Sequence, residues 1–116
     1  MHPLKTTILD YCLSLPYTQE DFPFDDKVWV AKVYGKIFIL MNLVEDDVRL
    51  NLKCDPTRAE ELRAEYDFVK PGYHMNKKHW NTIHWIDSGL DWLTLREWID
   101  HSYDLVLKSV PKSKRS

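Results

Sequence analysis

The residues whose types and spacing best suit chemistry in this sequence lie between positions 70 and 82. The surrounding segment, residues 68–86, contains three lysines and no Asp or Glu, and its polar side chains alternate with large aromatic ones. Cations interleaved with flat aromatic rings suit an anionic, flat-faced partner, and nucleic acid fits that description. The candidate contact residues in this stretch are Lys70, Tyr73, His74, Asn76, Lys77, Lys78, His79 and Trp80.

Different roles are expected within this stretch. The two adjacent lysines and His79 are predicted to contact phosphates, the lysines acting as point charges; the alternative is a solvated loop that closes back onto a sheet. Trp80 either stacks on a base or is buried with its indole N–H bonded to a nearby carbonyl group. His74 and Asn76 are alternatively hydrogen-bonding residues that fix the loop itself.

Four further cations are predicted to extend this surface. Residues 48–54 alternate between apolar and polar side chains, which is typical of a half-buried strand with its polar side outward. The cations of this strand, and those of two β-prone runs at residues 28–34 and 36–43, are then expected on the polar face of one sheet. These residues are Lys32, Lys36, Arg49 and Lys53.

The formal net charge of −2 is unevenly distributed along the chain. Residues 68–86 carry three positive charges and the tail after Asp104 carries four, so the remainder of the chain sums to −9. If the basic segments meet in space, the molecule is electrostatically polarised. A protein with a sequence pI of about 6.2 has no general attraction for nucleic acid, so its cations must be segregated on one face to bind it.

Metal, nucleophilic and phosphate-loop chemistry find little support in the residue spacing. His74, His79 and His84 match neither a helical i, i+4 pair nor a zinc-finger pattern. Ser, His and Asp occur together at residues 100–104 but within one helical turn, whereas a catalytic triad converges from different elements. The chain has only three glycines, and its two cysteines lack a Cys-x-x-Cys spacing and are interpreted as small buried hydrophobes. We therefore expect no catalytic residue, no metal and no cofactor.

The elements that position these residues follow from hydrophobic periodicity and from cap and turn signals. Helices are predicted at residues 4–15 and 56–66, the second beginning at the Asp55–Pro56 pair. A final helix is predicted from the capping-box spacing of Thr94 and Glu97. The residues expected on its buried side are Leu95, Trp98, Ile99, Ser102, Tyr103 and Val106. Strands are expected at residues 18–24, 28–34, 36–43, 48–54, 68–70 and 82–86, with a tight hairpin at Gly35.

Together these elements predict an α+β fold with two layers, an antiparallel sheet packed against helices in the order α-β-β-β-β-α-β-β-α. The 116 residues are expected to form a single domain, residues 1–116, whose last six residues are a frayed tail. No apolar run approaches the ~20 residues needed to span a bilayer, and no signal peptide is visible at the start. We expect a cytoplasmic protein without a membrane partner; its oligomeric state is not predicted.

Three runs of sequence, NLKCDP at residues 51–56, PGYHMNKKHWNT at 71–82 and DHSYDLV at 100–106, resemble the MmcQ/YjbR family of small bacterial proteins. Residues 22–24 and 35–38 look like earlier parts of the same pattern, so that the similarity covers nearly the whole chain. The resemblance implies a sheet packed against helices, similar to secretion-chaperone-like or frataxin-like arrangements. It also implies DNA binding by a double-wing shape in which β-hairpins grip the duplex. Tyr34 departs from the small residues common before Gly35, and a bulky tip would change how closely such a wing approaches a groove.

The function expected from these observations is non-enzymatic DNA binding, with phosphates contacted by the basic loop and by the polar face of the sheet. The alternative is a protein-interaction or chaperone-like module that presents exposed apolar groups such as Trp29, Phe38 or Trp92 to a peptide or partner protein. An enzyme is a third hypothesis, since it would need a pocket that gathers Tyr73, His74 and a distant carboxylate.

Overall fold

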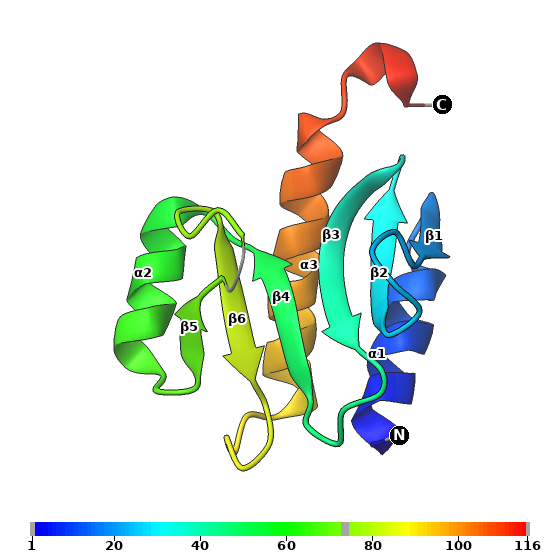
Figure 1. Ribbon diagram of the computed structural model, residues 1–116. Helices are drawn as coiled ribbons and strands as arrows, with labels where there is room; N and C mark the ends of the chain where they lie inside the picture. The colour runs from blue at the N-terminus through cyan, green and yellow to red at the C-terminus, as the bar shows by residue number, and fades with distance from the viewer. Residues whose placement is uncertain (1, 73–74, 116) are drawn as a thin grey trace.

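The computed structural model describes residues 2–72 and 75–115 and has two layers, a six-stranded antiparallel sheet and helices packed on it (Figure 1). The elements are α1 (Pro3–Ser14), β1 (Thr18–Asp21), β2 (Val28–Val33), β3 (Lys36–Asn42), β4 (Arg49–Lys53), α2 (Pro56–Glu65), β5 (Val69–Pro71), β6 (Trp80–His84), α3 (Trp92–Ser109) and a short 3-10 helix, η1 (Lys112–Lys114). The strand order is β1-β2-β3-β4-β6-β5. Helices α1 and α3 lie behind the sheet, and α2 lies beside β5 and β6. The predicted α+β class and element order are confirmed.

Two helix starts were predicted from their caps, and one prediction was wrong. Helix α2 begins as expected, with the Asp55 carboxylate accepting a hydrogen bond from the Arg58 N–H ahead of Pro56 at the first helical position. Helix α3 begins earlier than expected, at the N-cap Asp91, whose carboxylate accepts from the Thr94 N–H at 2.8 Å. Thr94 is therefore inside the first turn, and the capping-box interpretation fails because a better acceptor precedes it.

The last strand is shifted by two residues from its predicted position. It covers Trp80–His84 instead of residues 82–86, so Trp85 lies beyond it, half-buried, with its indole N–H donating to the Leu90 carbonyl at 3.0 Å. A two-residue shift keeps the alternation of a strand, so the side of the strand that faces the core is unchanged, and Ile83 lies in the core.

The core lies between the sheet and helices α1 and α3. Its α3 side consists of the residues predicted from helical spacing, and its β4 side contains Leu50 and Leu52, which face the same way as expected from their alternation. Both cysteines, Cys12 and Cys54, are free and buried, as predicted.

Ser102 joins helix α3 to the sheet at an irregularity in the strands. The β2–β3 register shifts between Ala31 and Lys32, and the β3–β4 pairing ends at Ile39 and Leu52. The fully buried Ser102 hydroxyl donates to the Phe38 carbonyl at 2.5 Å and accepts from the Lys53 N–H at 2.9 Å. A side chain from the helix thus satisfies two backbone groups that the strands leave unpaired, and Ser102 lies on the buried side of α3, as predicted.

No helix among the described residues is long and apolar enough to cross a membrane.

Candidate functional site

The connections between the strands of the antiparallel sheet lie at the two opposite ends of the strands. Each of these two ends of the sheet is called an edge here. Lys53, the last residue of β4, is paired with Trp80, the first residue of β6, so the β4 end and the β5–β6 loop share one edge. The β2–β3 turn lies at that same edge, because β3 runs antiparallel to β4. Lys36, the first residue of β3 after this turn, contacts the end of α3, its Nζ lying 3.4 Å from the Ser109 carbonyl oxygen. The C-terminal tail therefore joins this edge as well (Figure 1).

This edge carries an accumulation of cations, and we call it the basic edge. Its members come from the β2–β3 turn, the end of β4, the β5–β6 loop, and the end of α3 with the tail. They are Lys36, Lys53, Lys77, Lys78, Lys108, Lys112, Lys114 and Arg115. Two carboxylates, those of Asp55 and Asp104, also lie there. The two basic segments of the sequence thus lie at the same end of the molecule, as an electrostatically polarised protein requires.

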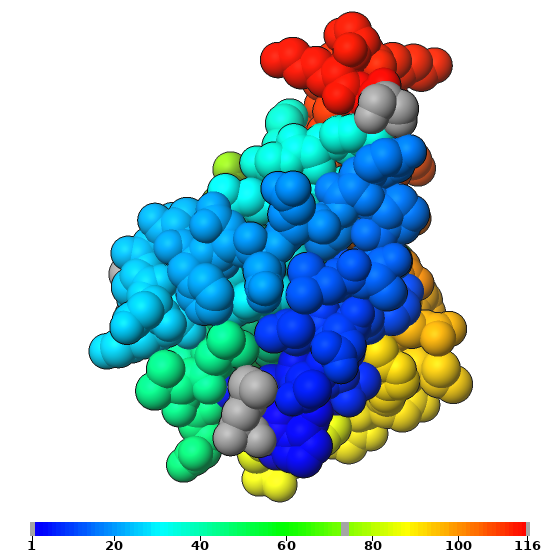
Figure 2. Space-filling view, turned by 90° about the vertical axis from the view of Figure 1, so that its right-hand side faces the viewer, coloured from blue at the N-terminus to red at the C-terminus, as the bar shows by residue number. Residues whose placement is uncertain are grey.

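The opposite edge is acidic. It is formed by the β3–β4 connection, the α2–β5 turn and the segment between β6 and α3. Its carboxylates are those of Glu45, Asp46, Asp47, Asp67, Asp87 and Asp91. Figure 2 shows segments of the two edges at opposite ends of the molecule, with the tail above the β2–β3 turn at one end, and the start of α1 with the segments after β3 and β6 at the other.

The loop between β5 and β6 is held in place by specific hydrogen bonds. The Asn76 side-chain oxygen accepts from the Lys78 N–H at 2.9 Å, and its carbonyl accepts from the N–H groups of His79 and Trp80. Arg63 of α2 donates to the Lys77 carbonyl and, at 2.6 Å, to Asn81. Asn76 is therefore a residue that shapes the loop, one of the two interpretations of its position, and the two lysines that follow it are exposed.

Gly72 allows the two ends of this loop to approach closely. Its N–H donates to the Trp80 carbonyl at 2.8 Å. A Cβ atom at this position would lie 2.8 Å from Trp80 Cβ, a distance that real Cβ contacts essentially never show. The start of this loop at Pro71–Gly72 therefore depends on glycine for space.

The predicted cationic face of the sheet divides into separate parts. Lys32 forms an ion pair with Asp21 at 2.7 Å, and Arg49 forms one with Glu45 at 3.2 Å. These two cations are partly neutralised by carboxylates close in space, which sequence spacing did not indicate. Lys36 and Lys53 instead belong to the basic edge. Lys70 is exposed on β5, opposite Thr82.

The aromatic candidates also have different positions. Trp80 is half-buried on β6, opposite Lys53 and on the face of the sheet turned away from the core. His79 is half-buried and follows the two lysines, and its carbonyl accepts from the Cys54 N–H at 2.8 Å. Tyr73 and His74, the remaining candidates, lie outside the described residues.

An aromatic pair at the basic edge was missed by sequence reasoning. Tyr17 and Tyr34 stack with ring centroids 4.6 Å apart and an interplanar angle of 22°, and both have a positive φ. Tyr34 forms the β2–β3 turn together with Gly35, which has the predicted positive φ of 79°. The two tyrosines are 17 positions apart in the sequence, and no local pattern indicates that they meet.

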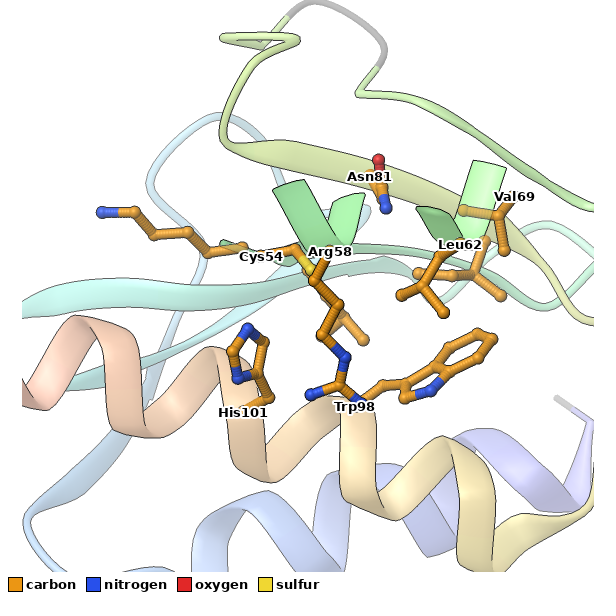
Figure 3. Close-up of a pocket in the computed structure, with 10 residues that line it drawn as sticks. Cys54, Arg58, Leu62, Val69, Asn81, Trp98 and His101 are labelled. Carbon is orange, nitrogen blue, oxygen red and sulfur yellow. The ribbon is translucent and has the colours of Figure 1, made fainter. Parts of the chain in front are cut away.

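A small crevice lies between α2, the sheet and α3 (Figure 3), where Arg58 extends toward α3 between His101 and Trp98. Its volume is about 10 Å³, room for about one water molecule and not for a substrate. His101 Nε2 accepts a hydrogen bond from the Asp55 N–H at 3.2 Å. Burial, followed by the nearby Arg58 cation, lowers the pKa of His101 below its ordinary value.

This lowered pKa predicts a pH dependence of stability. The unfolded chain binds a proton at this position more readily than the folded one. The contribution of neutral His101 to the free energy of unfolding is therefore fully present above about pH 6.5 and is lost as the pH falls below it. We expect His101→Gln, which keeps an acceptor for the Asp55 N–H, to lose less stability than wild type between about pH 7.5 and pH 5.5. The free energy of unfolding of both proteins at the two pH values tests this. Equal losses would show that His101 does not contribute.

Among residues 2–72 and 75–115, no group of three or more His, Cys, Asp or Glu side chains is placed to hold a metal ion. The apolar residues named for the alternative partner-binding hypothesis are unsuited to that role. Trp29 and Phe38 are fully buried, and Trp92 is half-buried with its ring edge-on to Tyr11. All three pack in or against the core. For Trp29 and Phe38 the sequence did not indicate this, because alternation along a strand does not show which of its two faces is covered.

Comparison with known proteins agrees with the fold and with the sequence runs. The family model YjbR matches residues 13–105. This chain belongs to the YjbR family. It is 36% identical to uncharacterized protein YbdF of Escherichia coli O157:H7, over 94% of this chain and 88% of that protein. It is 32% identical to uncharacterized protein YjbR of Escherichia coli strain K12, over 93% of this chain and 91% of that protein.

Two solved structures are similar in fold to this chain. The crystal structure of Deinococcus radiodurans protein DR2400, with a DUF419 domain, has a TM-score of 0.88 and 38% identity, covering 96% of this chain and 84% of that one. A structure from Pseudomonas syringae has a TM-score of 0.72 and 23% identity, covering 88% of this chain and 97% of that one, and supports the fold alone.

Proposed function

We propose that this YjbR-family protein binds nucleic acid, without enzymatic activity, through phosphate contacts of its basic edge. The observation that carries the proposal is the convergence of eight cationic side chains from four separate segments at one end of a molecule whose other end is acidic. Such a dipolar distribution orients the protein toward a polyanion even though the net charge is −2.

Two hairpin ends contribute to this edge and suit a double-wing grip. The β2–β3 turn carries Lys36, and the β5–β6 loop carries Lys77 and Lys78, with Lys53 between them at the end of β4. Lysines at hairpin tips reach phosphates as flexible point charges, which fixes position on the backbone without reading sequence. The proposal is therefore of binding with weak sequence preference.

The stacked tyrosines add a surface suited to bases. Tyr17 is 57% exposed, and its ring is supported from behind by Tyr34. A supported aromatic face of this kind stacks on unpaired bases, which contributes about 1–3 kcal/mol per base. Ends and single-stranded regions would gain this contact, whereas the phosphate contacts are common to all forms.

A titration at two salt concentrations tests the proposal. The full chain is titrated into a labelled duplex and into a single strand of equal length at ~50 mM and ~200 mM salt. If four to eight phosphates are neutralised, the slope of log K against log salt is about −4 to −7 for the duplex and shallower for the single strand. Absence of binding to both forms at the lower salt would overturn the proposal.

A further inference from the structure

The face of the sheet turned away from α1 and α3 contains two adjoining pockets. One has a volume of about 350 Å³ and the other about 170 Å³, and both are lined by Arg49 and Thr82. Strand pairing aligns Leu40, Asn51 and Thr82 in one row across β3, β4 and β6, with Lys70 of β5 next to Thr82. Together the pockets form one groove across the middle of the sheet, and their size is in the range of small-molecule sites.

The larger part of the groove has an apolar lining. Val28 and Leu40 contribute from β2 and β3, Phe24 from the β1–β2 loop, and Met75 from the β5–β6 loop. Phe24 is 65% exposed, so a large apolar ring that lines the groove is open to solvent. A ligand body lying in the groove would remove this ring from water, and that burial favours binding.

The smaller part of the groove is polar and cationic. It is lined by Arg49, Lys70 and His84, with Pro71 and Thr82. Arg49 is paired with Glu45, whereas the ion pairs of the described residues do not include Lys70. The formal charge left for a ligand is therefore one positive charge, with imidazole and guanidinium N–H groups as additional hydrogen-bond donors.

We propose that this groove binds a small organic monoanion, a carboxylate with an aliphatic or aromatic body. The apolar body would lie against Phe24 and Leu40, and the carboxylate would lie at Lys70 and Arg49. A single carboxylate matches the one unbalanced charge, and a dianionic phosphate would leave a negative charge uncompensated. The site is independent of the proposed nucleic-acid function, because Lys77, Lys78 and the tail take no part in it.

A titration of the isotope-labelled full chain with octanoate, followed by NMR, tests this proposal. We expect saturable shifts at the amides of Asn51, Lys70 and Thr82, and at least ~10-fold weaker binding of octanol, which lacks the charge. Phe24→Ala and Lys70→Gln are each expected to weaken octanoate binding by ~10-fold, a change of about 1.4 kcal/mol. Both side chains are exposed, so neither substitution removes core packing.

Matched controls come from the same region of the chain. Phe22→Ala and Lys27→Gln change exposed residues of the β1–β2 loop that do not line the groove, and they should bind octanoate within about twofold of wild type. Equal weakening by the control and test variants, shifts outside the groove, or equal binding of octanol would overturn the proposal. Octanoate binding that persists in a protein without nucleic-acid binding would separate the two proposals.

Discussion

Removing four cations from the basic edge is expected to lower the affinity for duplex DNA by a factor on the order of 10³–10⁴ at ~0.1 M salt, and to reduce the salt slope by about 3 to 4. The substitutions are Lys36→Gln, Lys53→Gln, Lys77→Gln and Lys78→Gln. Each neutralised phosphate releases condensed counterions, so each lost contact removes close to a tenfold contribution at this salt concentration. Fluorescence anisotropy over a range of salt concentrations measures both quantities.

The control must change the net charge equally without touching the basic edge. The variant with Lys27→Gln, Arg49→Gln, Lys70→Gln and Arg96→Gln does so, since its residues lie on the β1–β2 loop, at the start of β4, on β5 and near the start of α3. We expect it to weaken binding less than about tenfold and to keep most of the salt slope, because exposed charges more than a Debye length from the phosphates are screened. Equal losses in both variants would show that overall charge, and not the basic edge, governs binding.

Phe38→Ala is expected to lower the free energy of unfolding by about 3–5 kcal/mol, a large part of the 5–15 kcal/mol typical of a domain. Phe38 is fully buried, and its ring meets Tyr103 of α3 edge-on, with centroids 5.3 Å apart and an interplanar angle of 87°. Its carbonyl accepts the Ser102 hydroxyl, so a cavity here also disturbs the hydrogen bond that joins α3 to β3. Chemical denaturation of both proteins measures the difference.

Phe22→Ala provides the comparison for this prediction. Phe22 is 41% exposed on the β1–β2 loop, and truncation at such a position is expected to change the free energy of unfolding by less than about 1 kcal/mol. A loss below about 2 kcal/mol for Phe38→Ala would mean that the core relaxes into the space left by the ring. Similar losses in the two variants would contradict the role given to the Phe38–Tyr103–Ser102 contact.

Local order in this protein was predictable because it depends on residues close in sequence. The buried face of α3, the alternation of β4, the Asp55–Pro56 helix start and the Gly35 turn all follow from spacings of a few residues. Errors arose where two local signals competed. The start of α3 was predicted from the capping-box spacing of Thr94 and Glu97, whereas the residue that caps the helix is Asp91, three positions earlier.

The candidate surface was only partly predictable, because it depends on strand register and on which loops meet. The sequence by itself determined the element types, the α+β class, the family resemblance and the presence of basic segments at residues 70–78 and in the tail. Only the tertiary structure decided that these segments and Lys36 share one edge, that Lys32 and Arg49 pair with Asp21 and Glu45, and that Trp29 and Phe38 are buried. The physical reason is that antiparallel pairing sends alternate connections to opposite edges of the sheet, and charges distant in sequence become neighbours only when that pairing forms.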